Sequence, residues 1–413
     1  GSAGKIYKGK LAETTHKEVL PVTAHTKIEI KVIVDLPSFA ERSARTKITK
    51  IGLTRIEGII AEYGKHPEYF LRNRKIEEYE EIIFKGINEI AKYFSSIWVR
   101  TSDIRSDEYV NLEGAPKEIE ANPMLGMHGI RYGLKNPEIL KAEIRALKRV
   151  ADRGKEVGLL LPQIISVEEV KKTKKILNEI NFKNAKLGVM VETPAAVQVI
   201  RELCEEGIDF ISFGTNDLTQ FILAVDRGNE KVQDLYDEMN PAVLYQLEYV
   251  IRVCKRNNVY TSICGQSGSK KEMVKFLVEK GIDSISVNAD MAKEISDYVA
   301  QLEKEIVKGT DKEPRQYEIK KQKESKEEPE EMQNIDEKIK QVVEEIEELK
   351  QEAEEQEPLE ELQEIDEKIS EAIEAVKEIS GGKTEDLEEQ VEEFAEETKK
   401  HIKNSEEEVL DIF

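Results

Sequence analysis

Short apolar runs that alternate with stretches of helical periodicity constrain the fold of this chain more than any other feature of its sequence. Between these runs, stretches such as 77–94 and 136–154 place apolar residues at the spacing of an amphipathic helix. Eight such units over about 280 residues predict a (β/α)₈ barrel, a fold of roughly 250 residues, with a doubly wound open sheet as the alternative. The predicted strands are residues 27–34, 47–57, 96–103, 156–164, 186–193, 210–217, 259–266 and 283–290.

Two neighbouring strands of this pattern are each followed by an acid. The run LGVMV leads to Glu192, the run FISF leads to Asp217, and a helical stretch closed by Gly207 lies between them. Ligands bind at the carboxyl ends of parallel strands, where both acids would lie. Two carboxylates there suit Mg²⁺, which takes one or two of them and keeps positions for substrate oxygens. In the alternative interpretation, the two acids cap the helices that follow them.

Other polar and reactive side chains also occur where the apolar runs end. A closed barrel gathers all of these ends on one face, whereas scattered surface positions would not show this bias. We therefore expect a single site at the carboxyl end of the barrel. The side chains at these ends are Arg55, Arg100, Asp103, Glu192, Asn216, Asp217 and Cys264.

Acidic residues are concentrated in the last quarter of the chain. The formal net charge is −22; residues 311–413 hold 38 acids and 15 bases, and the first 310 residues hold 46 acids and 47 bases. The net negative charge of the chain therefore does not indicate which ligand the predicted barrel binds. No basic stripe with interleaved aromatic residues occurs, so we expect no nucleic-acid partner. No apolar run approaches the roughly 20 residues of a membrane span, so we expect no membrane association.

The cysteines and the first residues indicate where the protein works. Cys204, Cys254 and Cys264 match neither a zinc nor a disulfide framework, so we expect a reducing, cytoplasmic compartment. The chain begins with glycine in a turn-rich stretch and shows no signal peptide, and we interpret it as part of a longer protein. Frequent Glu, Lys and Ile are typical of thermophilic proteins.

The last part of the chain differs in kind from the predicted barrel. After a charged linker at 306–330, apolar residues recur in steps of four and three at 335–349 and again at 362–379. A seven-residue repeat of this kind predicts coiled-coil helices, and we expect residues 331–413 to drive homo-oligomer assembly. The helices pair either as a hairpin within one chain or with other subunits, and a lone solvated helix is the remaining alternative.

Ordered motifs along the first 305 residues are GLTRIEG (52–58), RTSDIRSDEYVNLEG (100–114), NPMLG (122–126), VETPAA (191–196), GTNDLTQ (214–220), AVDRGNE (224–230), ICGQ (263–266) and GIDSISVNAD (281–290). In this order they resemble the phosphoenolpyruvate-utilising enzymes: phosphoenolpyruvate synthase, pyruvate phosphate dikinase and enzyme I of the sugar phosphotransferase system. The front part is most similar to the synthase, whereas VETPAA and AVDRGN are more similar to enzyme I. With its helical tail, the whole chain resembles the large homomultimeric synthase-like proteins of hyperthermophilic archaea.

The resemblance implies a division of the chain and a reaction. Residues 1–20 would end a swivelling phosphohistidine domain, and residues 21–305 would form a barrel that binds phosphoenolpyruvate or pyruvate. The phosphohistidine would exchange its phosphoryl group with the pyruvate enolate, so that the full protein converts ATP, pyruvate and water into phosphoenolpyruvate, AMP and phosphate. One alternative is an enzyme I-like phosphoenolpyruvate:protein phosphotransferase. Another is a catalytically weakened barrel in a structural homomultimer.

The resemblance also implies roles for residues at the barrel mouth. Glu192 and Asp217 would hold Mg²⁺, and Arg100 would bind the phosphoryl group with its planar fork. Cys264 would be the general acid at the methylene carbon. Backbone and amide donors of the segment 214–216 would bind the pyruvate carboxylate. The substrate-binding residues implied are Arg55, Arg100, His128, Glu192, Gly214, Thr215, Asn216, Asp217 and Arg227.

Several of these residues also have a purely structural interpretation. Cys264 can be a small buried hydrophobe. Arg55 and Arg100 can be ion-pair partners of Glu57 and Asp103. These alternatives stay open from the sequence alone.

His128 departs from the family pattern, because relatives carry arginine in this position, where it contacts the phosphoryl group. Histidine is shorter, binds with one nitrogen at a time and is only partly charged near neutral pH. The change therefore indicates a weakened enzyme, an altered substrate, or a harmless substitution with Arg131 reaching into the site. We otherwise interpret Arg131 as structural, and Arg227 either contacts the ligand or holds its loop.

Overall fold

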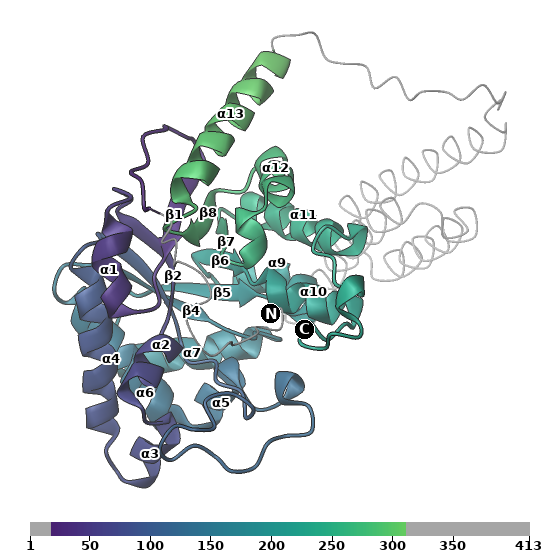
Figure 1. Cartoon of the computed structure of the whole chain (residues 1–413). Coiled ribbons are helices and arrows are strands. Elements are labelled where there is room, and N and C mark those ends of the chain that lie inside the picture. The colour runs from purple at the N-terminus through teal and green to yellow at the C-terminus, as the bar shows by residue number, and fades with distance from the viewer. Residues whose placement is uncertain (1–17, 311–413) are drawn as a thin grey trace, which may run out of the picture. The chain divides into compact units, whose positions relative to one another are not determined.

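Eight parallel strands close into a barrel in the computed structural model, which describes residues 18–310 (Figure 1). Each strand pairs with the next one along the chain, and β8 pairs with β1, so the sheet has no open edge. The prediction of a (β/α)₈ barrel is confirmed, and the open sheet is excluded. The strands are β1 (Glu29–Ile33), β2 (Lys50–Arg55), β3 (Ser96–Arg100), β4 (Glu156–Leu161), β5 (Lys186–Val191), β6 (Phe210–Phe213), β7 (Tyr260–Ile263) and β8 (Ser284–Asn288).

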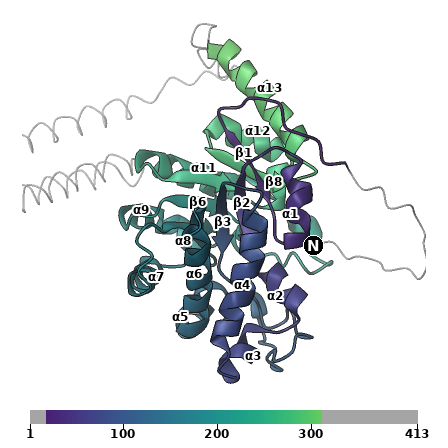
Figure 2. The same ribbon diagram turned by 90° about the vertical axis from the view of Figure 1, so that its left-hand side faces the viewer.

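Helices surround the barrel and connect its strands (Figures 1 and 2). Every strand lies inside one of the eight predicted runs, and the predicted helices 77–94 and 136–154 correspond to α4 and α6. The helices are α1 (Pro37–Ala44), α2 (Glu57–Tyr63), α3 (Pro67–Arg72), α4 (Ile76–Ala91), α5 (Gly129–Lys135), α6 (Pro137–Ala151), α7 (Val167–Glu179), α8 (Pro194–Gln198), α9 (Ile200–Glu205), α10 (Thr215–Leu223), α11 (Pro241–Arg256), α12 (Lys271–Lys280) and α13 (Ala292–Thr310), with short 3₁₀ turns η1 (Pro123–Leu125), η2 (Gln233–Leu235) and η3 (Gln266–Ser269).

The helical stretch before Gly207 forms two short helices rather than one. α8 ends at Gln198, Val199 has φ −98° and ψ 23°, and α9 begins with the next residue. Three of the four residues 197–200 are β-branched, and such residues are weak helix formers because the preceding turn restricts their χ1 angle. Gly207 follows α9 with a φ of +84°, a left-handed conformation that glycine adopts without a steric penalty.

Other predicted regions lie outside the described residues. These are the start of the chain up to residue 17, the coiled-coil region 331–413 and the linker after Thr310, where the description of α13 ends. The predictions for these regions therefore stay predictions. Within residues 18–310, no helix is long and apolar enough to cross a lipid bilayer.

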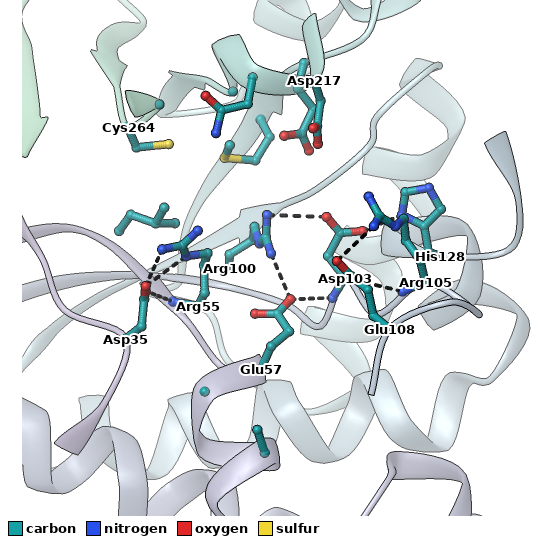
Figure 3. Close-up of a pocket in the computed structure, with 18 of the residues that line it drawn as sticks. Asp35, Arg55, Glu57, Arg100, Asp103, Arg105, Glu108, His128, Asp217 and Cys264 are labelled. Carbon is teal, nitrogen blue, oxygen red and sulfur yellow. Dashed lines mark hydrogen bonds and ion pairs between the residues drawn. The ribbon is translucent and has the colours of Figure 1, made fainter. Parts of the chain in front are cut away.

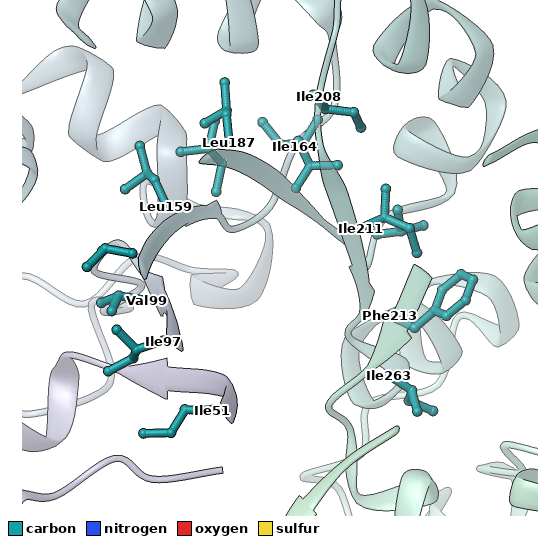
Figure 4. Packing of buried hydrophobic residues seen from close by; sticks show 14 of the residues in the cluster. Ile51, Ile97, Val99, Leu159, Ile164, Leu187, Ile208, Ile211, Phe213 and Ile263 are labelled. Carbon is teal, nitrogen blue, oxygen red and sulfur yellow. The ribbon is translucent and has the colours of Figure 1, made fainter. Parts of the chain in front are cut away.

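Strand side chains that point outward form the main apolar core with the helices (Figure 4). Because successive side chains of a strand point to opposite faces, alternate residues belong to this layer. On β6, for instance, Ile211 and Phe213 pack outward and are fully buried. Burial on both faces of the sheet explains why the strands are near-continuous apolar runs in the sequence.

A second, smaller cluster fills the barrel interior. The rings of Trp98 on β3 and Phe210 on β6 stack with centroids 4.2 Å apart and an interplanar angle of 15°. Gly158 on β4 leaves the space for this stack, since a Cβ atom there would lie 2.2 Å from Trp98 Cε3. Lys31 lies on the amino-terminal side, with its ammonium nitrogen 5.1 Å from the Phe210 ring centroid and 4.7 Å from that of Tyr260. Free space is therefore found toward the carboxyl ends of the strands.

A buried acid connects the outer helices to the loop that follows β3. Glu143 on α6 accepts hydrogen bonds from the Tyr79 hydroxyl on α4, at 2.8 Å, and from the backbone N–H of Ser102, at 3.2 Å. Burial raises the pKa of Glu143 to about 7, although these hydrogen bonds act in the opposite direction. The carboxyl group therefore keeps its proton in the folded protein at pH values where the unfolded chain has lost it.

We predict that Glu143 makes the protein less stable as the pH rises from about 4.5 to about 7. In this window the unfolded chain releases the proton and the folded chain retains it, so the free energy of unfolding falls by up to about 3 kcal/mol, at about 1.4 kcal/mol per pKa unit. Glu143→Gln should remove this loss of stability. Glu138→Gln, which changes an exposed acid of the same helix, should not remove it. Urea unfolding at pH 5 and pH 8 measures the difference, and equal pH dependence in both variants would contradict the prediction.

Candidate active site

A cavity of about 730 Å³ opens at the carboxyl ends of the strands (Figure 3). Its walls come from the ends of β2, β3, β5, β6 and β7 and from the loops that follow them. Thr215 is the predicted site residue that does not line it, because its side chain is buried and its hydroxyl lies 2.6 Å from Ser267 Oγ. The predicted residues that do line it are Arg55, Arg100, His128, Glu192, Gly214, Asn216, Asp217, Arg227 and Cys264.

Glu192 and Asp217 lie side by side on neighbouring strand ends. Gln163 contacts both: its backbone N–H donates to Glu192 Oε1 at 2.8 Å, and its side-chain amide donates to Asp217 Oδ2 at 3.2 Å. Burial, together with the charges of Asp217 and Asp103, raises the pKa of Glu192 well above its ordinary value. Burial also raises the pKa of Asp217, although Arg227 acts against it. Both carboxylates therefore lack sufficient compensating charge.

The helix-capping interpretation does not account for Glu192. The helix after β5, α8, is capped by Thr193, whose hydroxyl accepts from the backbone N–H of Ala196 at 3.0 Å. Asp217 does lie in the first turn of α10, but its carboxylate contacts Gln163 and Arg227. The two acids are thus directed toward the cavity and its walls.

The pair fits a hard divalent cation. Within residues 18–310, no group of three or more histidine, cysteine or acidic side chains is arranged to hold a metal ion alone. Mg²⁺, however, uses one or two carboxylates and completes its coordination with water and substrate oxygens. The cavity lining contains seven acids against four arginines and His128, so with every acid ionised and the histidine charged its formal charge is −2. A divalent cation would balance this charge.

Arg100, at the end of β3, is fixed between two acids. Its guanidinium donates to Glu57 Oε1 at 2.9 Å and lies 3.3 Å from Asp103 Oδ2. The backbone N–H of Asp103 also donates to Glu57, at 2.6 Å, which ties the loop after β3 to α2. Burial disfavours the charge on Arg100, but Glu57 and Asp103 outweigh this and raise its pKa well above the ordinary value. Arg100 is therefore both the buried ion-pair partner considered from the sequence and a wall of the cavity.

Arg55, at the end of β2, has a different partner from the one considered. Its backbone N–H and its side-chain Nε both donate to the Asp35 carboxylate, each at 2.9 Å. Its side chain is 46% exposed, against 12% for Arg100. Arg55 therefore lies at the open rim of the cavity, paired with Asp35 rather than Glu57.

His128 supplies a buried cation with little freedom to move. Its Nδ1 lies 2.7 Å from Asp103 Oδ1, and its Nε2 lies 2.9 Å from the Met124 carbonyl oxygen. Both neighbours are acceptors, so only the doubly protonated ring satisfies both. Burial would lower the pKa of His128, but the Asp103 carboxylate and the Met124 carbonyl outweigh it and raise the pKa. The ring is thus charged, and both of its nitrogens are held by the protein.

Arg227 and Arg131 both hold loops near the cavity. Arg227 lines the cavity and pairs with Asp217, with Nη2 2.7 Å from Oδ1, and its contact with a ligand stays a prediction. Arg131 donates to the carbonyl oxygens of Gly126, at 3.2 Å, and Leu125, at 3.3 Å. It ties down the loop before α5 and does not line the cavity, in agreement with a structural role.

Cys264 follows β7 directly and faces the interior cluster. Its thiol lies 3.6 Å from the Phe213 carbonyl oxygen, and burial raises the pKa of Cys264 to about 11. The thiol is therefore neutral near pH 7 and can donate a proton. Cys204 and Cys254 lie on α9 and α11 with their sulfur atoms 4.0 Å apart and do not line the cavity.

The segment 214–216 forms the amino end of α10. The Gly214 N–H donates to the Val191 carbonyl oxygen at 3.1 Å, so it is already used. Thr215 and Asn216 are the first two residues of the helix, where backbone N–H groups lack acceptors within the helix and favour anions. Gly214 must be glycine here, because a Cβ atom would lie 2.3 Å from Glu192 Oε2.

Some residues of the site were not identified from the sequence. Gln163 is the last residue but one of the fourth predicted run, 156–164, and this position was its only signal. Arg105 pairs with Asp107 and Glu108 in the long loop after β3, where no periodic pattern distinguishes a cavity residue from a surface residue. The lining residues in this group are Asp35, Glu62, Arg105, Glu108 and Tyr109.

Comparison with known proteins gives consistent matches. The family profile described as PEP-utilising enzyme, PEP-binding domain, matches residues 10–304. The chain is 45% identical over 323 residues to a probable phosphoenolpyruvate synthase of Archaeoglobus fulgidus, covering 74% of this chain and 42% of that protein. It is 43% identical over 324 residues to the phosphoenolpyruvate synthase of Pyrococcus furiosus, with coverages of 74% and 40%.

A relative with a different name also matches. The phosphoenolpyruvate-protein phosphotransferase of Buchnera aphidicola is 37% identical over 224 residues, covering 51% of this chain and 33% of that protein. The chain thus spans less than half the length of these relatives. Because the family profile spans the whole barrel, the chain belongs to the phosphoenolpyruvate-utilising enzymes and contains their phosphoenolpyruvate-binding domain.

Proposed function

We propose that the cavity binds phosphoenolpyruvate or pyruvate together with Mg²⁺. In the full-length protein, the phosphoryl group would pass between the pyruvate enolate and a phosphohistidine of a swivelling domain, as in a phosphoenolpyruvate synthase. The observation that carries this proposal is the buried pair Glu192 and Asp217, which faces one cavity together with Arg100 and Cys264. The high identity to proteins named phosphoenolpyruvate synthase supports the same reaction.

The charged residues would bind and orient the phosphoryl group. Phosphoryl transfer depends mainly on positioned positive charge around the spreading negative charge. Arg100 is suited to this task because Glu57 and Asp103 hold its guanidinium in one orientation. Glu192 and Asp217 would hold the ion, and bound Mg²⁺ would supply charge stabilisation for the enolate oxygen. The backbone N–H of Asn216, which lines the cavity in the first turn of α10, would bind the substrate carboxylate.

Cys264 would exchange the proton at the methylene carbon. In the direction of pyruvate, the enolate oxygen would lose its phosphoryl group to the free histidine nitrogen of the swivelling domain, and the thiol of Cys264 would give its proton to carbon and become a thiolate. In the direction of phosphoenolpyruvate, the thiolate removes a methyl proton, and the enolate oxygen then takes the phosphoryl group. The raised pKa of Cys264 favours the neutral thiol as the resting form.

Two alternatives have specific support. The match to a phosphoenolpyruvate-protein phosphotransferase favours an enzyme I-like activity. A carrier-docking domain before residue 1 would indicate this activity, whereas an ATP-binding domain there would indicate the synthase. A catalytically weakened barrel in a structural assembly is favoured by His128, which replaces the family's arginine and has both ring nitrogens engaged by the protein.

The tail would assemble the protein into a homo-oligomer. The proposal rests on the seven-residue apolar repeats at 335–349 and 362–379, because a narrow apolar stripe is stable only when another helix covers it.

The site prediction is that oxalate and phosphoenolpyruvate bind this chain only when Mg²⁺ is present. Isothermal titration calorimetry measures both ligands with and without the metal. Asp217→Asn should weaken Mg²⁺-dependent binding at least tenfold, about 1.4 kcal/mol, because it removes one of two ion-binding carboxylates. Asp234→Asn, the same change at an exposed aspartate, serves as the matched control. Ligand binding of equal strength without Mg²⁺ would contradict the proposal.

The proton-transfer prediction concerns Cys264→Ser. This variant should bind oxalate and Mg²⁺ within about twofold of wild type, but should exchange the pyruvate methyl protons with D₂O at least about 100-fold more slowly, the lower bound for losing a general acid–base group. Proton NMR of pyruvate with Mg²⁺ and inorganic phosphate measures the exchange. Cys254→Ser is the control, and an unchanged exchange rate in Cys264→Ser would reject the assigned role.

The assembly prediction uses two neighbouring residues of the tail. Ile339→Asp places a charge in the apolar stripe and should lower the particle mass measured by light scattering, whereas Lys340→Asp, one residue away and outside the stripe, should leave it unchanged. Deletion of residues 311–413 should give the same mass as Ile339→Asp or a lower one. A mass unaffected by the deletion would remove the assembly role from the tail.

A further inference from the structure

Gln163 occupies a strained position at the end of β4. Its φ is +56°, a left-handed backbone conformation that costs a residue other than glycine some strain, and such strain persists where the surroundings determine it. Gln163 is 1% exposed. The residues on either side are anchored, since the Pro162 carbonyl accepts from Ile130 N–H at 3.2 Å and the Ile164 carbonyl accepts from the Thr193 hydroxyl at 2.6 Å.

The strained conformation directs two donors of one residue at two acids. The backbone N–H of Gln163 donates to Glu192 Oε1 at 2.8 Å, and the side-chain amide reaches past β5 to Asp217 Oδ2 at 3.2 Å. The NH₂ end of the amide must face this carboxylate, because an amide oxygen would be repelled by it. Gly129 leaves the necessary space, as a Cβ atom there would lie 2.8 Å from Gln163 Cβ.

These hydrogen bonds leave ion-binding oxygens toward the cavity. Among the hydrogen bonds within residues 18–310, Glu192 accepts through Oε1 from Gln163, and none involves its Oε2. Asp217 is held on both sides, by Gln163 at Oδ2 and by Arg227 at Oδ1, and each oxygen has a further lone pair. Gln163 is thus the one residue among those described that contacts both acids through hydrogen bonds.

We propose that Gln163 is a positioning residue of the cation site, which holds Glu192 and Asp217 side by side in the orientation that the ion requires. The inference rests on the proposed function, because it takes these two acids to be the ion's ligands. Donors that orient metal ligands from behind contribute strongly to affinity, and their removal typically weakens metal binding about 10–100-fold. A glycine would relieve the strained backbone but would lack the amide, so the glutamine at this position favours a role for its side chain over a role in the turn alone.

The test measures binding of Mn²⁺ alone, a paramagnetic probe of Mg²⁺ sites, by electron paramagnetic resonance on the full chain. Gln163→Met keeps the length of the side chain and the backbone N–H but loses the donor to Asp217, and should raise the Mn²⁺ dissociation constant about tenfold or more. Gln198→Met makes the same chemical change at an exposed position on α8 and should leave the constant unchanged.

A second variant separates positioning from folding. Gln163→Gly removes the amide and also relieves the left-handed backbone, which offsets part of the cost of deleting a buried side chain, so the variant should stay folded with a cooperative melting transition while its Mn²⁺ affinity falls as in Gln163→Met. If wild type binds Mn²⁺ and both variants bind it equally well, the positioning role is wrong and the proposed function stands. If wild type itself binds no Mn²⁺ at millimolar concentration, the cation site and this inference are both wrong.

Discussion

Closure of the sheet between β1 and β8 is the constraint on which the site depends. Parallel strands direct their carboxyl ends the same way, and a closed ring brings these ends into one circle. Residues as distant in sequence as Arg55 on β2 and Cys264 after β7 therefore line one cavity. Below them, the stacked rings of Trp98 and Phe210 fill the interior, so the free volume lies at the end where the polar residues are.

The acids that line the cavity orient its arginine side chains, and this pairing leaves the arginines less able to bind an anion by themselves. Each arginine that lines the cavity is paired with an acid, as Arg55 is with Asp35 and Arg227 is with Asp217. Such pairing holds a guanidinium in one direction but offsets its charge, so the attraction it offers an anionic substrate is reduced. Glu192, in contrast, contacts a backbone N–H rather than a cation. A divalent ion at this residue would compensate the excess negative charge and would restore the attraction for an anionic ligand.

The sequence predicted what depends on periodicity and on the ends of elements. All eight strands lie inside the predicted runs, because strands buried on both faces are continuous apolar stretches, and the residues just after them, such as Glu192 and Cys264, line the cavity. Pairing was predicted less well: Arg55 contacts Asp35 rather than Glu57, since partners across a loop depend on its path. Gln163 was missed for a related reason, because its function depends on a left-handed backbone angle that no local pattern indicates.

His128 acts on the site through its neighbours. Its Nδ1 contacts Asp103 Oδ1, while Arg100 lies against Oδ2 of the same carboxylate. Burial would raise the pKa of Asp103, but these two cations outweigh burial and lower it, so the acid stays charged and keeps Arg100 oriented. An arginine at this position would have a planar guanidinium long enough to contact a bound ligand. The imidazolium of His128 instead uses both nitrogens to bind the protein, and so it holds Asp103 in place without contacting a ligand. On the weakened-enzyme hypothesis, Arg100, held by Glu57 and Asp103, would be left to bind an anionic ligand without a second guanidinium at position 128.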